Sequence, residues 1–168
     1  MIMTITTSEV ISAIKRHLSI IGKRLYTKDG KNLFSNITLS SVEDKPILKQ
    51  YIYSSAQDIE AVLKQFVTAS SYVEGGGTAL DPVNPHIEMT ISNTRGDSDF
   101  SNRVKDLSVS YITLNSVGEY LSMVHPELAQ KYQRDARQKI EALVSYVFYK
   151  DPPTATADPL TATSSVTT

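Results

Sequence analysis

Apolar residues recur at three- and four-residue steps through most of this chain, which is the spacing of amphipathic helices. The first such stretch follows Thr6, which lies three residues before Glu9 and fits a capping box at a helix start. One apolar stripe then continues through Val10, Ile14, Leu18, Ile21 and Leu25. We expect this first helix to end before the turn at Asp29-Gly30.

A second and longer helix is predicted from Ser41, which suits the cap position, with Pro46 in the first turn. Its apolar positions are Ile47, Tyr51, Ala56, Ile59, Leu63, Phe66 and Val67. The pattern extends to about Ser71, and a helix of roughly 25 residues would be about 38 Å long. The glycine run Gly75-Gly76-Gly77 then ends the helix and opens a loop.

The next stretch changes from helical to alternating periodicity. Residues His86–Ser92 read HIEMTIS and place Ile87, Met89 and Ile91 on one face. This alternation predicts a half-buried strand. We therefore expect residues 73–102, approximately, to form a loop-and-strand excursion from a helical body.

Two more helices are predicted before residue 150. Apolar residues keep heptad-like spacing at Phe100, Val104, Leu107, Tyr111, Leu114, Leu121 and Val124. The stretch Leu107–Leu114 also alternates like a strand, but the wider pattern exceeds a strand's length and favours a helix. Pro126 breaks this element and suits the first turn of a last helix that ends at Lys150. The buried stripe of this last helix is Leu128, Tyr132, Ala136, Ile140, Leu143 and Val147.

These elements predict a mainly α protein: a small helical bundle with a long second helix, a loop-and-strand excursion and an extended C-terminal tail. We expect one domain over residues 1–150 and a Thr/Pro-rich tail over residues 151–168. The tail has only two sizeable apolar residues, Leu160 and Val166. Such a segment buries too little surface to offset the entropy of ordering it. Two interpretations follow: a tail that lies along an adjacent protein, or a flexible end with no role, as most Thr/Pro-rich ends are.

Composition supports a single domain and narrows the functional classes. The chain has 168 residues, of which 40% are hydrophobic and 21% are charged, as in ordinary globular proteins. Its net charge is −1, so the whole chain is neither a strongly basic nucleic-acid binder nor an acidic mimic of nucleic acid. The absence of cysteine removes disulfides, thiolate metal sites and cysteine nucleophiles. We expect no signal peptide and no membrane-spanning segment.

Candidate catalytic and metal-binding residues are sparse. The three histidines, His17, His86 and His125, fall in different predicted elements, without the spacing of metal ligands. His125 precedes Pro126 and is interpreted as a helix cap or surface residue. The glycine run lacks the Lys-Ser/Thr pair of a phosphate-binding loop. We therefore expect no enzymatic activity, no cofactor and no metal site.

One group of basic residues stands out from the otherwise mixed charges along the chain. Basic residues accumulate between positions 15 and 31, where Asp29 is the one acid. The candidate contact residues in this run are Lys15, Arg16, Lys23 and Arg24. Contact with phosphates or with an acidic partner surface is one interpretation. The other is a solvated helix face, which charge runs usually form.

The order of elements resembles that of head-to-tail connector, or neck adaptor, proteins of tailed bacteriophages. The resemblance covers roughly residues 7–150. Its early part is a helix closing on HLSIIGKRLYTKDGKNLFSNI and a second helix, SVEDKPILKQYIYSSAQDIEAVLKQFV. Its last part is DLSVSYITLNSVGEYLSMVHPELAQKYQRDARQKIEALVSYVFYK, with a break at His125-Pro126-Glu127 before a final amphipathic helix.

The resemblance implies a structural virion protein without catalytic residues. Such proteins form a ring beneath the portal, usually with twelve-fold symmetry, and extend the DNA channel toward the tail. The implied partners are further copies of the chain, the portal protein, the next neck or tail protein, and nearby packaged DNA, with no membrane. The chain would be made in the host cytoplasm and reside in the virion neck. The candidate inter-subunit contacts are Gly75, Gly76, Gly77, Ile87, Met89, Ile91, Leu160 and Val166.

Other functional classes remain open on the sequence alone. A nucleic-acid-binding packaging or regulatory protein would need a helix-turn-helix or a basic recognition helix, and neither pattern is visible. A generic helical interaction module also fits the sequence. A small histidine-based hydrolase is a more distant alternative.

Overall fold

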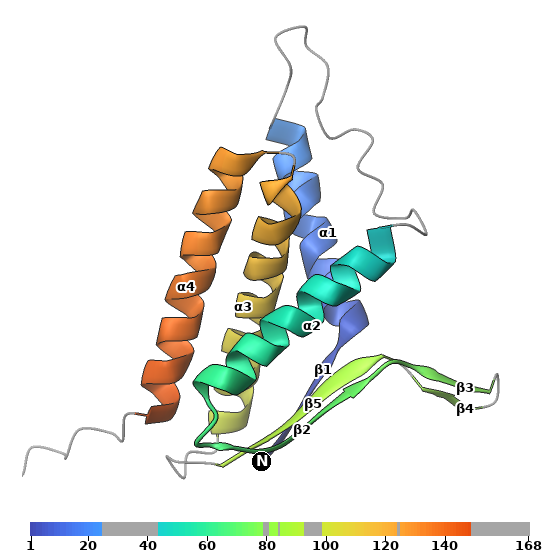
Figure 1. Ribbon diagram of the computed structural model, residues 1–168, viewed down its shortest axis with the longest axis vertical. Helices are drawn as coiled ribbons and strands as arrows, with labels where there is room; N and C mark the ends of the chain where they lie inside the picture. The colour runs from blue at the N-terminus through green and yellow to red at the C-terminus, as the bar shows by residue number, and fades with distance from the viewer. Residues whose placement is uncertain (25–43, 79–80, 84, 93–98, 124, 149–168) are drawn as a thin grey trace, which may run out of the picture.

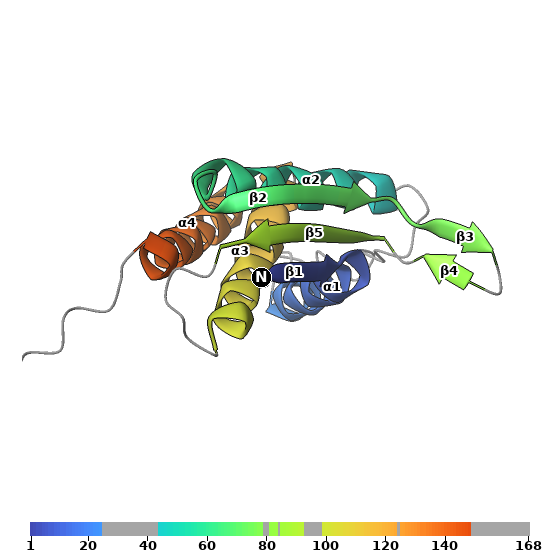
Figure 2. The ribbon, with the colours of Figure 1, turned by 90° about the horizontal axis from the view of Figure 1, so that it is seen from below.

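The computed structural model describes residues 1–24, 44–78, 81–83, 85–92, 99–123 and 125–148. Within these residues, helices cover one face of a three-stranded antiparallel sheet, and a two-stranded ribbon projects beyond that sheet (Figures 1 and 2). The elements are β1 (Ile2–Thr6), α1 (Thr7–Arg24), α2 (Asp44–Val62), β2 (Val67–Val73), β3 (Gly76–Thr78), β4 (Asp81–Val83), β5 (His86–Ile91), α3 (Phe100–Ser122) and α4 (Pro126–Phe148). The mainly α class is therefore confirmed.

Strand β5 is the centre of the sheet, with the order β1-β5-β2. Both neighbours run antiparallel to it, and Ile87 lies opposite Ile5 on one side and Tyr72 on the other. The side chains alternate as predicted, so that Ile87, Met89 and Ile91 face the helices and are at most 1% exposed. The predicted strand is confirmed.

The first strand, β1, is an element that the sequence interpretation missed. Met3 and Ile5 are buried against the helices, whereas Ile2 is exposed on the opposite face. Hydrogen bonds between Met1 and Ile91 extend the pairing: the Ile91 N–H donates to the Met1 carbonyl at 2.8 Å. Because β1 is short and a helix starts directly after it, the stronger helical pattern hides the alternation of the strand in the sequence.

Helix α1 agrees with its predicted start. The Glu9 N–H donates to Thr6 Oγ1 at 3.3 Å, so Thr6 caps the helix. The Glu9 carboxylate instead lies 3.6 Å from Lys105 Nζ on α3. The stripe from Val10 to Ile21 is buried, as predicted.

The predicted length of the second helix is wrong. Helix α2 ends at Val62 instead of continuing to about Ser71, and strand β2 occupies Val67–Val73. Ile47 is 40% exposed, and Leu48 is buried in its place. Strand β2 pairs with β5, which lies roughly twenty positions further along the chain. A bulge between Val67 and Ala69 interrupts the alternation of buried and exposed side chains in β2.

Glu60 holds strand β2 against helix α2. Its two carboxylate oxygens accept hydrogen bonds from Ser70 Oγ at 2.8 Å and from the Tyr72 hydroxyl at 3.0 Å. Burial and the bond to Glu60 raise the pKa of Tyr72 above its ordinary value of 10, so that the phenol remains a donor. A single carboxylate thus fixes the position of the edge strand.

Helices α3 and α4 begin where the sequence places them. Helix α3 is continuous from Phe100 to Ser122, so the stretch Leu107–Leu114 is helical, as the sequence favours. His125 Nδ1 accepts a hydrogen bond from the Leu128 N–H at 3.3 Å, so the predicted cap of α4 is confirmed.

Several predictions fall outside the described residues. They concern the turn at Asp29-Gly30, the cap at Ser41, the helix end at Lys150 and the tail over residues 151–168, with Leu160 and Val166.

Gly118 sets the distance between α3 and α4. A Cβ atom at this position would lie 2.9 Å from Gln133 Cγ and 3.4 Å from Gln133 N. We expect Gly118→Val to lower the free energy of unfolding by about 1–3 kcal/mol, because the added methyl groups push the two helices apart. Urea denaturation measures this change.

Ser122→Val is the matched control, because Ser122 is an exposed residue of the same helix. Its expected cost is at most about 0.5 kcal/mol, because serine and valine have similar helix propensities and the exposed hydrogen bond from Ser122 Oγ to the Glu119 carbonyl is readily replaced by water. Equal effects of the two substitutions would contradict a close approach of the helices at Gly118.

Candidate interaction surfaces

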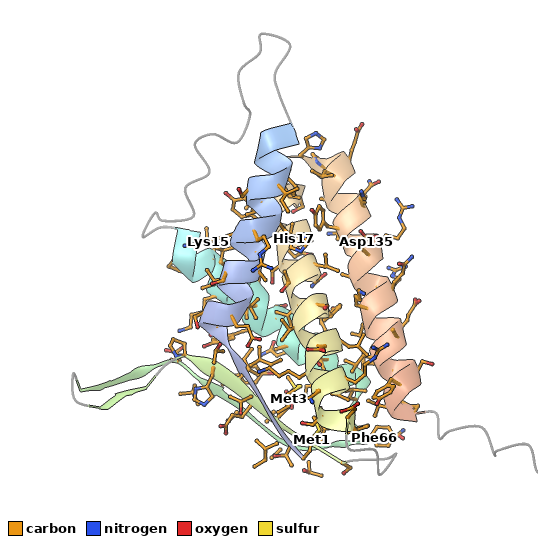
Figure 3. The ribbon with its side chains drawn as sticks, turned by 180° about the vertical axis from the view of Figure 1, so that it is seen from behind. Met1, Met3, Lys15, His17, Phe66 and Asp135 are labelled. Atoms are coloured by element: carbon orange, nitrogen blue, oxygen red, sulfur yellow. The ribbon has the colours of Figure 1, made fainter. Side chains whose placement is uncertain are left out.

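The basic residues predicted as a contact site lie on α1. Lys15 and Arg16 are exposed, and Lys23 and Arg24 belong to the last turn of the helix, where the structure describes the backbone alone. Lys15 and His17 lie on different sides of α1, with His17 on the side toward α4 (Figure 3). The structure thus leaves Lys15 and Arg16 available to a partner.

His17 is a packing residue of the α1–α4 contact. Its ring meets Tyr132 edge-on, with 5.8 Å between centroids. Burial lowers the pKa of His17 below its ordinary value of 6.5, and the nearby Arg16 lowers it further. His17 is therefore neutral at pH 7 and serves as an aromatic contact.

The glycine run opens the projecting ribbon instead of ending a helix. Gly75 has a φ of 85°, a conformation that favours glycine. A Cβ atom there would lie 2.8 Å from Cγ and Cδ of Pro85. Gly76 and Gly77 then belong to β3, which pairs with β4 from Gly76↔Val83 to Thr78↔Asp81.

Three other predicted contact residues lie in the chain's own core. Ile87, Met89 and Ile91 are buried between the sheet and the helices. A side chain that is buried in the core of its own chain exposes no surface to a neighbouring subunit, so these residues cannot supply an inter-subunit contact in this fold. Their alternation indicated burial, and the covering surface belongs to helices of the same chain, including α2.

A polar seam joins α2 to α3, and the sequence interpretation did not find it. The Tyr111 hydroxyl donates to Asp58 Oδ2 at 2.9 Å, and Asn115 Nδ2 donates to Ser55 Oγ at 3.1 Å. The polar groove along this seam has a volume of about 280 Å³ and is lined by Gln50, Tyr51, Ser54, Asp58, Asn115 and Glu119.

The electrostatics of the seam keep Tyr111 protonated. Burial raises the pKa of Tyr111 above its ordinary value of 10, and the hydrogen bond to Asp58 and the charge of Glu119 raise it further. The hydrogen-bond donors and acceptors of the seam are thus already paired with one another. Asp58 and Tyr111 are separated by 53 positions, so no local spacing signals their contact.

Among the described residues, no group of three or more His, Cys, Asp or Glu side chains could hold a metal ion. None of the helices in the described ranges combines the length and apolarity needed to cross a membrane.

Comparisons with protein-family models, with curated proteins and with solved structures give no match.

Tyr111→Phe tests the seam. We expect it to lower the free energy of unfolding at pH 8 by about 0.5–1.5 kcal/mol, because Asp58 loses a hydrogen bond. The raised pKa of Tyr111 means that its stabilising effect is complete below pH 10 and is lost as the pH rises above that value. The variant should therefore lose less stability than the parent chain between pH 10 and 11.

Urea unfolding at pH 8, 10 and 11 measures both effects. Tyr51→Phe is the control, because the Tyr51 hydroxyl lies 4.0 Å from the Met123 sulphur and makes a far weaker contact. A Tyr111 variant with the parent's alkaline profile would contradict this role of the phenol.

Proposed function

We propose that the chain is a non-catalytic structural subunit of a homo-oligomeric assembly. The observation that carries the proposal is the β3–β4 ribbon, which continues the β2–β5 pair away from the helical body (Figures 1 and 2). An isolated two-stranded ribbon is marginally stable in water. Contact with a neighbouring copy would stabilise such a ribbon.

The base of the ribbon is anchored to the body on both sides. On the β2 side, the Tyr53 hydroxyl donates to the Val73 carbonyl at 3.3 Å, and Lys49 Nζ lies 3.5 Å from Glu74 Oε1. On the β5 side, the Thr7 N–H donates to the Pro85 carbonyl at 3.0 Å. These contacts fix the direction in which the ribbon leaves the body, as an arm that reaches a neighbour requires.

The finer proposal is a ring in the neck of a tailed phage, between the portal and the tail. It rests on the sequence resemblance over residues 7–150. In this setting the ribbon would contact the next subunit, and Lys15 and Arg16 would face the portal protein or the DNA. The small net charge of −1 suits a channel that lets DNA pass without holding it.

Removal of the ribbon tests self-association. We expect a variant in which an Asn-Gly turn replaces residues 75–84 to remain folded, because that turn closes a tight hairpin between β2 and β5. It should be a monomer at concentrations where the parent chain forms oligomers. Light scattering coupled to size-exclusion chromatography measures the mass, and thermal unfolding checks the fold.

The matched control is the double variant Ala79→Asn and Leu80→Gly, which changes the link between β3 and β4 and keeps both strands. It should assemble like the parent. A parent chain that is monomeric at every concentration, or a ribbon-free variant that still assembles, would overturn the role of the ribbon.

Reversal of charge on α1 tests the basic surface. We expect Lys15→Glu with Arg16→Glu to leave self-association unchanged, because these residues lie on the helical body and not on the ribbon. The isolated parent chain should bind duplex DNA only weakly. Tight binding that falls steeply with salt and is lost in the double variant would favour the nucleic-acid-binding alternative.

A further inference from the structure

An apolar groove lies where the end of α2 approaches the C-terminal half of α4. Its volume is about 520 Å³, and its lining residues are Val62, Arg137, Ile140, Glu141, Val144 and Ser145. Val62 at the end of α2 is 41% exposed. The groove thus presents apolar side chains from two helices to the surface.

Phe148 continues the apolar stripe of this groove. Ile140, Val144 and Phe148 are spaced four residues apart and therefore share one face of α4. The Phe148 ring packs edge-to-face on Phe66, with 4.7 Å between centroids, yet remains 42% exposed. Phe66 lies beside the C-terminal end of α4 (Figure 3). Residue 149 follows Phe148 directly, so the C-terminal segment leaves α4 one turn beyond Val144, which lines the groove.

We propose that the groove binds the chain's own C-terminal segment, residues 149–168, with Leu160 as the anchoring side chain. Beyond Lys150, Leu160 and Val166 are the two sizeable apolar residues. Leu160 is the larger of the two and the nearer to Phe148. Val62 lines the groove and is 41% exposed, and Phe148, one turn beyond Val144 on α4, is 42% exposed, so apolar surface remains here for a further segment to cover.

The length of the connecting segment suits a return to the groove. Val144 and Ile140 lie roughly 6 and 12 Å back along α4 from Phe148, at 1.5 Å per residue. Leu160 lies twelve positions after Phe148. A fully flexible chain of that length has a typical end-to-end distance of about 19 Å, which Pro152, Pro153 and Pro159 increase by favouring extended backbone. Leu160 therefore reaches the groove without stretching, at a millimolar effective concentration that a separate molecule rarely matches.

Charge contributes little to this docking. The lining of the groove has one basic and one acidic residue, Arg137 and Glu141. The segment carries Lys150, Asp151 and Asp158. The apolar contact of Leu160 therefore carries the proposed binding.

The absence of native cysteine allows a direct test of proximity in the full-length chain. We expect Val144→Cys with Thr161→Cys, which keeps the Leu160 anchor, to form an intramolecular disulfide under mild oxidation. The matched control is Ala142→Cys with Thr161→Cys. Ala142 is exposed and lies two residues from Val144, on the opposite side of α4. The two pairs have nearly the same tether length, so a difference in rate reports on where Leu160 resides.

The Val144 pair should close at least about tenfold faster than the Ala142 pair, because docking raises the local concentration of residue 161 at one face of the helix. Non-reducing electrophoresis measures the rates, and thermal unfolding of the reduced variants checks the fold. Equal rates for the two pairs would overturn the proposal. Disulfide-linked dimers specific to the Val144 pair would also overturn it, by assigning the groove to the tail of a second copy.

Discussion

The burial of helix α3 is the constraint on which the rest of the structure depends. Helices α1, α2 and α4 all contact α3, which also contacts β1. To pack on so many sides, α3 carries small side chains at its contacts, including Ser108, Ser116 and Gly118. The hydroxyls of Ser108 and Ser116 have no hydrogen-bond partner in the described part of the chain. Close packing therefore comes with a desolvation cost of about 1–3 kcal/mol for each hydroxyl.

The same burial explains what the sequence could and could not predict. Helices α1 and α4 carry one-sided stripes, and their starts follow from Thr6 and His125-Pro126. Helix α3 is buried on several faces, so its stretch Leu107–Leu114 lacks a single stripe and also alternates like a strand, and only the length of the wider pattern favours a helix. Strand β5 was predictable because one face is buried and the other is not. Strands β1 and β2 were missed because their identity depends on a partner strand elsewhere in the chain.

The candidate surfaces show a similar limit. The alternation of Ile87, Met89 and Ile91 indicates burial, but it does not say whether the covering surface belongs to the same chain or to another. The glycine run marks a change of direction, yet the ribbon depends on Gly75 meeting Pro85, which is ten positions away. The seam between Asp58 and Tyr111 exists only once α2 and α3 are packed. Local pattern thus predicts elements, whereas sites arise from packing.

The pairing of β1 with β5 has a consequence for the order of events during synthesis. Ile5 pairs with Ile87, so the edge strand stays incomplete until more than eighty further residues have left the ribosome. At 5–20 residues per second, this interval is about 4–17 s. Throughout it, β1 has no strand to pair with, and helix α3, which contacts β1, has not been made. The growing chain thus displays an unpaired apolar β-strand, which is a target for chaperones that bind extended apolar segments.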